Sequence, residues 1–188
     1  HILTEQDWDL LIGGIKLGNA HISSSTIKKM EIDYSGSIWM TATTISQSTT
    51  VGGVGVMNMI VEDSVIEQFE VFNEGLISVT SAGNAPSLVS CIKIDGTLSN
   101  VTFESMNVMV IGDVVVTSSG EEGLASLFDI SVIGTTESVI NSFDWIVFGN
   151  VSGPVRKVRG IGMAFTRISD VILKNGNVAM TGTVEWFG

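Results

Sequence analysis

The stretch that decides the fold runs from residue 100 to residue 114 and reads NVTFESMNVMVIGDV. It contains one glycine, Gly112, with apolar residues nine and four positions before it and two positions after it. The same arrangement surrounds four further glycines, at positions 36, 75, 149 and 182. Successive glycines are therefore 39, 37, 37 and 33 residues apart. A pattern that returns at this period indicates one structural unit stacked on copies of itself.

The apolar positions of the unit also predict its shape. Nine positions before the glycine lie Ile27, Ile66, Phe103, Ile140 and Leu173; four before lie Ile32, Val71, Val108, Trp145 and Val178; two after lie Ile38, Ile77, Val114, Val151 and Val184. In the first four units a further apolar residue lies six positions before the glycine, and mostly polar residues separate it from the one at nine. Because side chains of a strand alternate between its faces, two inward residues three positions apart require a bend between them. The glycine would form a second corner through a positive φ. Each unit is expected to run strand, corner, strand, corner, strand.

Three strands and two corners make a triangular coil, which resembles the parallel β-helix repeat of pectin-lyase-like proteins and of phage tail spikes. The resemblance covers about residues 25–187 and is best over residues 100–108. It implies an all-β chain that folds as a right-handed parallel β-helix of about five rungs. The alternative is that each glycine is the tip of a hairpin, which would give an antiparallel β-sandwich or barrel of repeated hairpins.

The chain is divided into an entry segment, residues 1–24, and a five-repeat β domain, residues 25–188. The entry segment has the pattern of a helix start, with Thr4 as the capping residue, and Gly13 and Gly14 would end the helix. Because stacked repeats need their open ends covered, this segment is expected to form a short helical cap.

Composition excludes several classes of partner. The 188 residues include 20 acidic and 9 basic ones, for a formal net charge of −11. Nucleic acids and anionic membrane surfaces bind basic proteins, so neither is an expected partner, and no apolar stretch approaches the roughly 20 residues of a membrane span. Hydrophobic residues make up 44% of the chain and charged residues 15%, whereas about 25% is average for charged residues. We expect such a chain to bury surface against copies of itself.

Stacked coils place equivalent residues in columns about 4.8 Å apart, and two of these columns contain acids. One column holds Glu31, Glu70, Asn107, Asp144 and Asn177, and the other holds Lys28, Glu67, Glu104, Asn141 and Lys174. Adjacent carboxylates can serve as acid and base, so Glu67, Glu104 and Asp144 are the candidates if the protein cleaves polysaccharides, as the resemblance allows. The preferred interpretation is a polar ladder and no enzyme, because Asn residues interrupt the acids of the first column.

No cofactor or metal is expected. The two histidines are His1 and His21, and both lie in the entry segment. The single cysteine, Cys91, lies in an alternating run and is predicted to be a buried structural thiol.

Two adjacent units carry three consecutive apolar residues directly before the glycine. They are Met109, Val110 and Ile111 in one unit and Ile146, Val147 and Phe148 in the next. Three consecutive strand residues cannot all point inward, so an outer apolar patch is expected. It is interpreted as a subunit interface; the alternative is that a loop or the entry helix covers it.

A charged loop is the second candidate contact. Arg156, Lys157 and Arg159 lie in the variable loop of the last unit, and Glu121 and Glu122 lie in the same loop of the unit before it. These opposite charges predict either a solvated loop or a contact that attracts a partner.

The favoured function is a structural or adhesive module, a segment of a virion-associated or extracellular fibre or spike. It would assemble with itself, with a homotrimer as the expected state, and contact surface glycans or another virion protein. The virion or cell-surface location follows from the resemblance to tail spikes alone. The alternatives are a polysaccharide lyase or glycoside hydrolase, and a subunit of a polymeric surface filament whose residues 184–187 pair with the next copy.

Overall fold

The computed structural model describes residues 11–42, 50–83, 86–118, 123–166 and 171–187, which contain strands and turns and no helix. The strands are β1 Leu11–Gly18, β2 His21–Ser23, β3 Thr26–Ser35, β4 Ile38–Ala42, β5 Thr50–Glu74, β6 Ile77–Ser81, β7 Leu88–Ile111, β8 Val114–Ser118, β9 Leu124–Gly134, β10 Ser138–Phe148, β11 Val151–Gly153, β12 Lys157–Thr166, β13 Val171–Thr181 and β14 Val184–Trp186.

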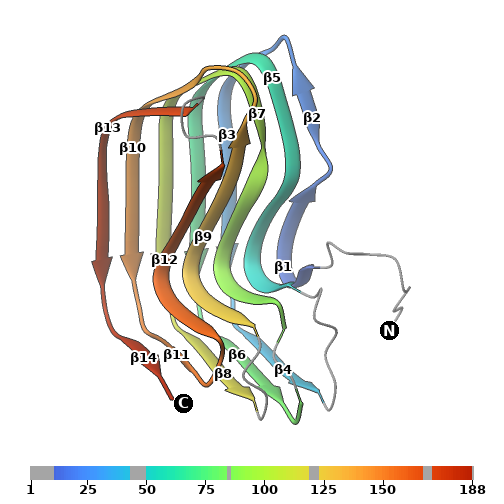
Figure 1. Ribbon diagram of the computed structural model, residues 1–188, viewed down its shortest axis with the longest axis vertical. Coiled ribbons are helices and arrows are strands. Elements are labelled where there is room, and N and C mark those ends of the chain that lie inside the picture. The colour runs from blue at the N-terminus through green and yellow to red at the C-terminus, as the bar shows by residue number, and fades with distance from the viewer. Residues whose placement is uncertain (1–10, 43–49, 84–85, 119–122, 167–170, 188) are drawn as a thin grey trace.

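The chain is a parallel β-solenoid of about four turns. Its first face stacks β1, the start of β5, the start of β7, β9 and β12. Its second face stacks β3, the end of β5, the end of β7, β10 and β13. Its third face is a five-stranded sheet in the order β14-β11-β8-β6-β4. Figure 1 shows these layers in sequence, from the blue first coil at one end to the red last coil at the other.

The pairing confirms the parallel alternative and contradicts the antiparallel one. Each strand pairing over the described residues is parallel. The register places each motif position against the same position of the next coil, as in Val71 opposite Val108 and Trp145 opposite Val178. The sequence pattern therefore predicted both the fold and the register.

The inward columns form one continuous core. Ile66, Phe69, Val108 and Trp145 are all at most 2% exposed. The rings of Phe69 and Phe103, one coil apart, meet edge to face with their centres 5.9 Å apart, a favoured arrangement for stacked aromatic side chains. Each face contributes rows of side chains to a core that runs the length of the stack.

The recurring glycine forms the corner between the second and third faces, and its requirement is steric. The Gly75 N–H donates to the carbonyl of Ile111 at 2.9 Å, so the hydrogen-bond ladder continues through the corner. A Cβ on Gly75 would collide with the carbonyl oxygen of Gly36 in the coil before, and one on Gly112 would collide with that of Gly75. Gly75 also has a φ of +138°. The expected positive φ is present, and the close approach of stacked backbones is a second reason for glycine.

Other corners use asparagine and aspartate, which the sequence analysis did not identify. Asn58, Asp63 and Asn100 have φ values of 54°, 47° and 54°, a left-handed conformation that Asn and Asp adopt more readily than most residues. The Asn100 side-chain amide donates to Asp63 Oδ1 at 2.9 Å, so the corner residues of two coils are also linked. These turns let β5 and β7 bend around the core without a break.

The helical cap is not supported. Residues 11–14, expected to end a helix, lie in β1, which pairs with β5, and residues 1–10 lie outside the described residues. The described part of the entry segment is the start of the first coil, not a separate cap. The close approach of β1 to β5 explains the glycines at positions 13 and 14, because a Cβ on Gly14 would collide with the backbone of Gly53.

We expect Gly75→Ala to lower the free energy of unfolding by more than about 2 kcal/mol, because the added Cβ meets a backbone carbonyl at a positive φ. Gly36→Ala is the matched control at the same motif position: the nearest described atoms belong to the Tyr34 side chain, 3.1 Å away or more. Urea unfolding at low protein concentration measures both variants. Equal losses would show that neither the backbone collision nor the positive φ at Gly75 accounts for its cost, because Gly36 has neither.

Burial raises the pKa of the Cys91 thiol from 9.0 to about 12, with a smaller contribution from the charge of Asp113. Between these values the unfolded thiol ionises while the folded one does not. We therefore expect the unfolding free energy to fall as pH rises above 9. The fall should be steeper than that of the Cys91→Ala variant by about 1.4 kcal/mol per pH unit. Denaturant unfolding from pH 8 to 10.5 measures this difference, and parallel slopes for the two proteins would contradict it.

Candidate interaction surface

The outer surface of the second face carries the first predicted acidic column. Glu31 lies opposite Glu70, Glu70 opposite Asn107, and Asp144 between Asn107 and Asn177. The Asn177 amide donates to Asp144 Oδ1 at 3.1 Å. The column is a ladder of partly exposed polar side chains, as the sequence predicted.

One lysine forms ion pairs with both acids at the N-terminal end of this ladder. Lys29 Nζ lies 2.9 Å from a carboxylate oxygen of Glu31 and 2.9 Å from one of Glu70. Hydrogen bonds to Glu31 and then to Glu70 raise the pKa of Lys29 above its usual value. The remaining acid of the column, Asp144, faces an amide on either side.

An apolar strip runs beside the acidic column. Phe72, Met109 and Ile146 lie in register on β5, β7 and β10, and Ile111 and Phe148 lie in register two residues further on. Met109 is 37% exposed and Phe148 is 44% exposed. We refer to Phe72, Met109, Ile111, Ile146 and Phe148 as the apolar strip.

The six residues predicted as an interface divide between surface and core. Met109, Ile111, Ile146 and Phe148 point outward and belong to the strip, whereas Val110 and Val147 are 0% exposed and lie in the core cluster. The alternation of strand side chains explains this, because the middle residue of three must face the other way. Val110 and Val147 therefore support the strip from within and do not reach its surface.

A shallow groove separates the acidic column from the apolar strip. Glu70, Asp144 and Asn107 line one wall, Phe72 and Met109 line the other. Val71 and Val108, whose side chains are buried, form part of its floor. The groove follows the stacking direction, since its lining residues come from the same positions of successive coils. It presents a charged wall and an apolar wall to whatever lies on this face.

The candidate catalytic carboxylates lie in ladders. The register brings Glu67 opposite Glu104, as expected, because their neighbours Ile66 and Phe103 pair. Asn141 donates to Glu104 Oε2 at 2.9 Å and accepts from Lys174 Nζ at 2.9 Å. These links are those of a polar corner, and the polysaccharide-cleaving hypothesis stays a prediction.

The charged loop divides in a similar way. Arg156, in the turn between β11 and β12, and Lys157, the first residue of β12, are exposed. Arg159 instead forms an ion pair with Asp129, which is 4% exposed and also bonds Lys93 Nζ at 2.9 Å. Asp129 of β9 thus joins β7 to β12. Glu121 and Glu122 lie outside the described residues, and the head-to-tail or partner contact of these charges stays a prediction.

A further ladder, directly after the recurring glycine, escaped the sequence analysis. Asp113 Oδ1 accepts from the Asn150 backbone N–H at 2.7 Å, and Asn150 Oδ1 accepts from the Thr183 N–H at 3.0 Å. The signal was present as a polar column of Ser37, Asp113, Asn150 and Thr183, interrupted by Leu76. These side chains satisfy backbone groups at the corner.

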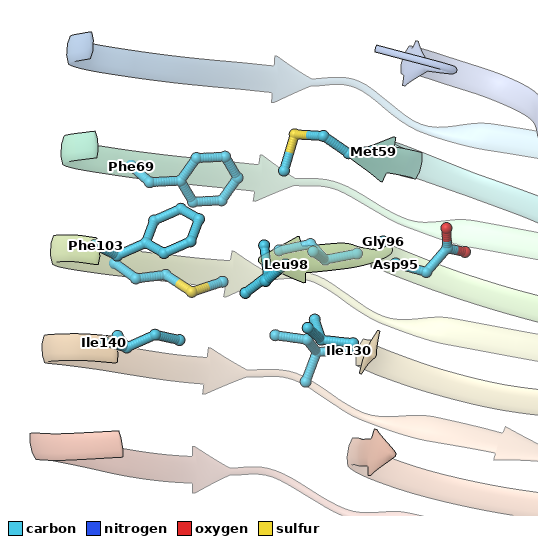
Figure 2. Close-up of a pocket in the computed structure, with 11 residues that line it drawn as sticks. Met59, Phe69, Asp95, Gly96, Leu98, Phe103, Ile130 and Ile140 are labelled. Carbon is cyan, nitrogen blue, oxygen red and sulfur yellow. The ribbon is translucent and has the colours of Figure 1, made fainter. Parts of the chain in front are cut away.

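A small cavity lies inside the core, and it is not a binding site. It measures about 20 Å³, room for a single water, and its lining includes Phe69, Phe103 and Ile130. Figure 2 shows these side chains converging from three successive coils, while the carboxylate of Asp95 points away from the rings. Its apolar walls offer a ligand no polar anchor, so the cavity is a packing gap.

Within the described ranges, no group of three or more His, Cys, Asp or Glu residues is placed to hold a metal ion. Over the same residues, no helix is present that is long and apolar enough to cross a membrane.

We expect Asp129→Asn to lower the free energy of unfolding by about 3 kcal/mol, because it leaves Lys93 and Arg159 without their shared carboxylate. Asp144→Asn removes a partly exposed carboxylate that accepts a hydrogen bond from the Asn177 amide, so its cost should stay within about 0.5 kcal/mol. Urea unfolding of the two variants tests this. Similar costs would mean that the Asp129 ion pairs contribute no more than a surface contact.

Comparison with known protein families, with curated proteins and with solved structures finds no match to this chain. The structure establishes a parallel β-solenoid, but kinship with pectin-lyase-like proteins or tail spikes is not shown.

Proposed function

We propose that this protein is a structural module of a fibre or spike, which assembles with further copies of itself through the second face. The observation that supports the proposal is the apolar strip. Its side chains lie side by side on adjacent strands of a flat, hydrogen-bonded face. Contiguous exposed apolar surface of this kind is typical of protein contact sites.

The surroundings of the strip fit a subunit interface. Aromatic residues and methionine are enriched at interface centres, while charged and polar residues form the rim. The strip contains Phe72, Phe148 and Met109, with the acidic column on one side. The Ile111 and Phe148 column continues through the exposed Glu74 to Ser35 at one end of the stack and to Thr181 at the other. An apolar centre bounded by polar positions is thus formed by three successive coils.

The solenoid itself suits a mechanical role. Its backbone hydrogen bonds run along the stacking direction, so each coil holds the next over its whole length. Of the carboxylates suspected of catalysis, Glu104 accepts from the Asn141 amide and Asp144 accepts from the Asn177 amide. These features support a stiff connecting element rather than an enzyme.

A closed cyclic trimer is the assembly that we propose, because identical strips around one axis would all be buried while the ends of the rods stay free. The location on a virion or cell surface, and contact with glycans or another virion protein, belong to this proposal and rest on similarity of shape to tail spikes.

We expect the Met109→Lys, Phe148→Lys double variant to lose the lateral oligomer, so that its mass at low concentration is that of the monomer, because it places two charges in the apolar centre. Light scattering over a range of concentrations measures the mass. Ile133→Lys, which changes a residue of matching exposure, 43%, on β9 away from the strip, should leave the mass unchanged. A wild-type chain that is monomeric throughout would contradict the proposal.

A further inference from the structure

We propose that the C-terminal end of the solenoid docks head-to-tail on the first coil of another copy, so that the stack continues from one molecule into the next. This contact is independent of the apolar strip. It uses the edges of β12, β13 and β14 on one molecule and those of β1, β3 and β4 on the other. The occupant of the C-terminal end is therefore a second copy of this chain.

The last coil leaves the core open. Leu173, Val178 and Val184 occupy inward positions of the repeat but are 37%, 43% and 45% exposed. Their counterparts one coil earlier, Ile140, Trp145 and Val151, are 2%, 0% and 0% exposed. The difference arises because no coil covers the last one among the residues that the structure describes.

The strand edges at this end are open as well. β13 pairs with β10, β14 with β11 and β12 with β9, and no described strand pairs with their other edges. Figure 1 shows β12, β13 and β14 as the outermost layer of the stack. A parallel strand edge with an exposed apolar row beside it is a template for another strand.

The first coil presents the columns that would continue the last one. Leu173, Val178 and Val184 would meet Ile27, Ile32 and Ile38 of the next copy; Gly182 would meet Gly36, Thr183 would meet Ser37, and Asn177 would meet Glu31. Apolar positions fall on apolar positions and polar ladders continue. The unfavourable neighbour among these columns is Lys174 against Lys28, so docking should strengthen as salt screens that pair.

Gly36 supports head-to-tail docking independently of the open strand edges. At each step within the chain, a Cβ on the later glycine would collide with the carbonyl of the earlier one, as at Gly182 against Gly149. A Cβ on Gly36 would meet only the end of the Tyr34 side chain among the described residues, and Gly36 has no positive φ. Nothing described within one molecule therefore requires glycine at position 36. A docked copy would require it, because the Gly182 carbonyl of that copy would lie against it.

Disulfide trapping tests the register directly. In the docked pair, Thr183 of one copy and Ser37 of the next would lie about 4.8 Å apart, within disulfide reach, whereas in a single chain they are separated by four steps, about 19 Å. We expect an equimolar mixture of Ser37→Cys and Thr183→Cys to form a covalent dimer on mild oxidation with copper phenanthroline. Cys91 is 0% exposed and takes no part.

Two controls and the result of the mixture itself decide what the crosslink means. Thr80→Cys, exposed on β6 in the second coil, replaces Ser37→Cys in the mixture and should give no dimer with Thr183→Cys. Dimers formed by Thr183→Cys alone would mean tail-to-tail packing and overturn the proposal. Absence of dimer in the Ser37→Cys mixture would also overturn it, and would indicate that other protein covers the C-terminal end.

Gly36→Ala tests the same contact without a crosslink. A head-to-tail contact does not close, so the mass should rise steadily with concentration. The Met109→Lys, Phe148→Lys background removes the lateral contact. In this background we expect the Gly36→Ala protein to need an at least tenfold higher concentration to reach the same mass. Thr80→Ala, which changes an exposed residue on β6 in the second coil and away from both ends, should not change it. A wild-type chain that grows axially without a lateral contact would reject the proposed trimer alone, and one that forms the lateral contact without axial growth would reject head-to-tail docking alone.

Discussion

The stacking of each coil on the next through parallel backbone hydrogen bonds is the constraint on which the rest of the structure depends. It requires the same residue position to recur at the same place in every coil, because a shift by one residue would turn each inward side chain outward. It also brings backbones so close at the corners that Gly75 and Gly112 cannot carry a side chain. Length differences between units fall in segments outside the paired faces, such as that between β6 and β7, and at one register shift within β5, between Val56 and Met59.

The same stacking determines the surface. Since outward residues also form columns, any residue type that recurs in the repeat becomes a ladder, and any apolar residue that recurs becomes a strip. Asn141 thus links Glu104 to Lys174, and Asn177 bonds Asp144. Phe72, Met109 and Ile146 form a continuous apolar row for the same reason. The stacking of equivalent residues thus produces both the hydrogen-bonded acids and the surface that we propose as an interface.

A stack of this kind has sides and ends, and the two differ physically. The sides are closed by side chains that alternate between core and solvent, so a lateral contact rests on what the outward columns contain. The ends expose strand edges and inward residues such as Val178, so an axial contact continues the core itself. Lateral and axial assembly can therefore coexist, since they use different residues of the same coil.

The sequence alone predicted the solenoid, its register and the membership of its columns from the spacing of apolar residues around each glycine, but it left an antiparallel alternative that only the strand pairing excluded. It also led to a wrong interpretation of residues 11–14, where glycines required by close strand packing have the same local pattern as a helix end. Strand alternation could have placed Val110 and Val147 in the core, because each lies two residues after an inward residue of the repeat, Val108 or Trp145. Only the tertiary structure decided that Arg159 is committed to buried Asp129. The register places Arg159 opposite Ser126, so this ion pair depends on the direction in which the long side chain extends, which a repeat period does not encode.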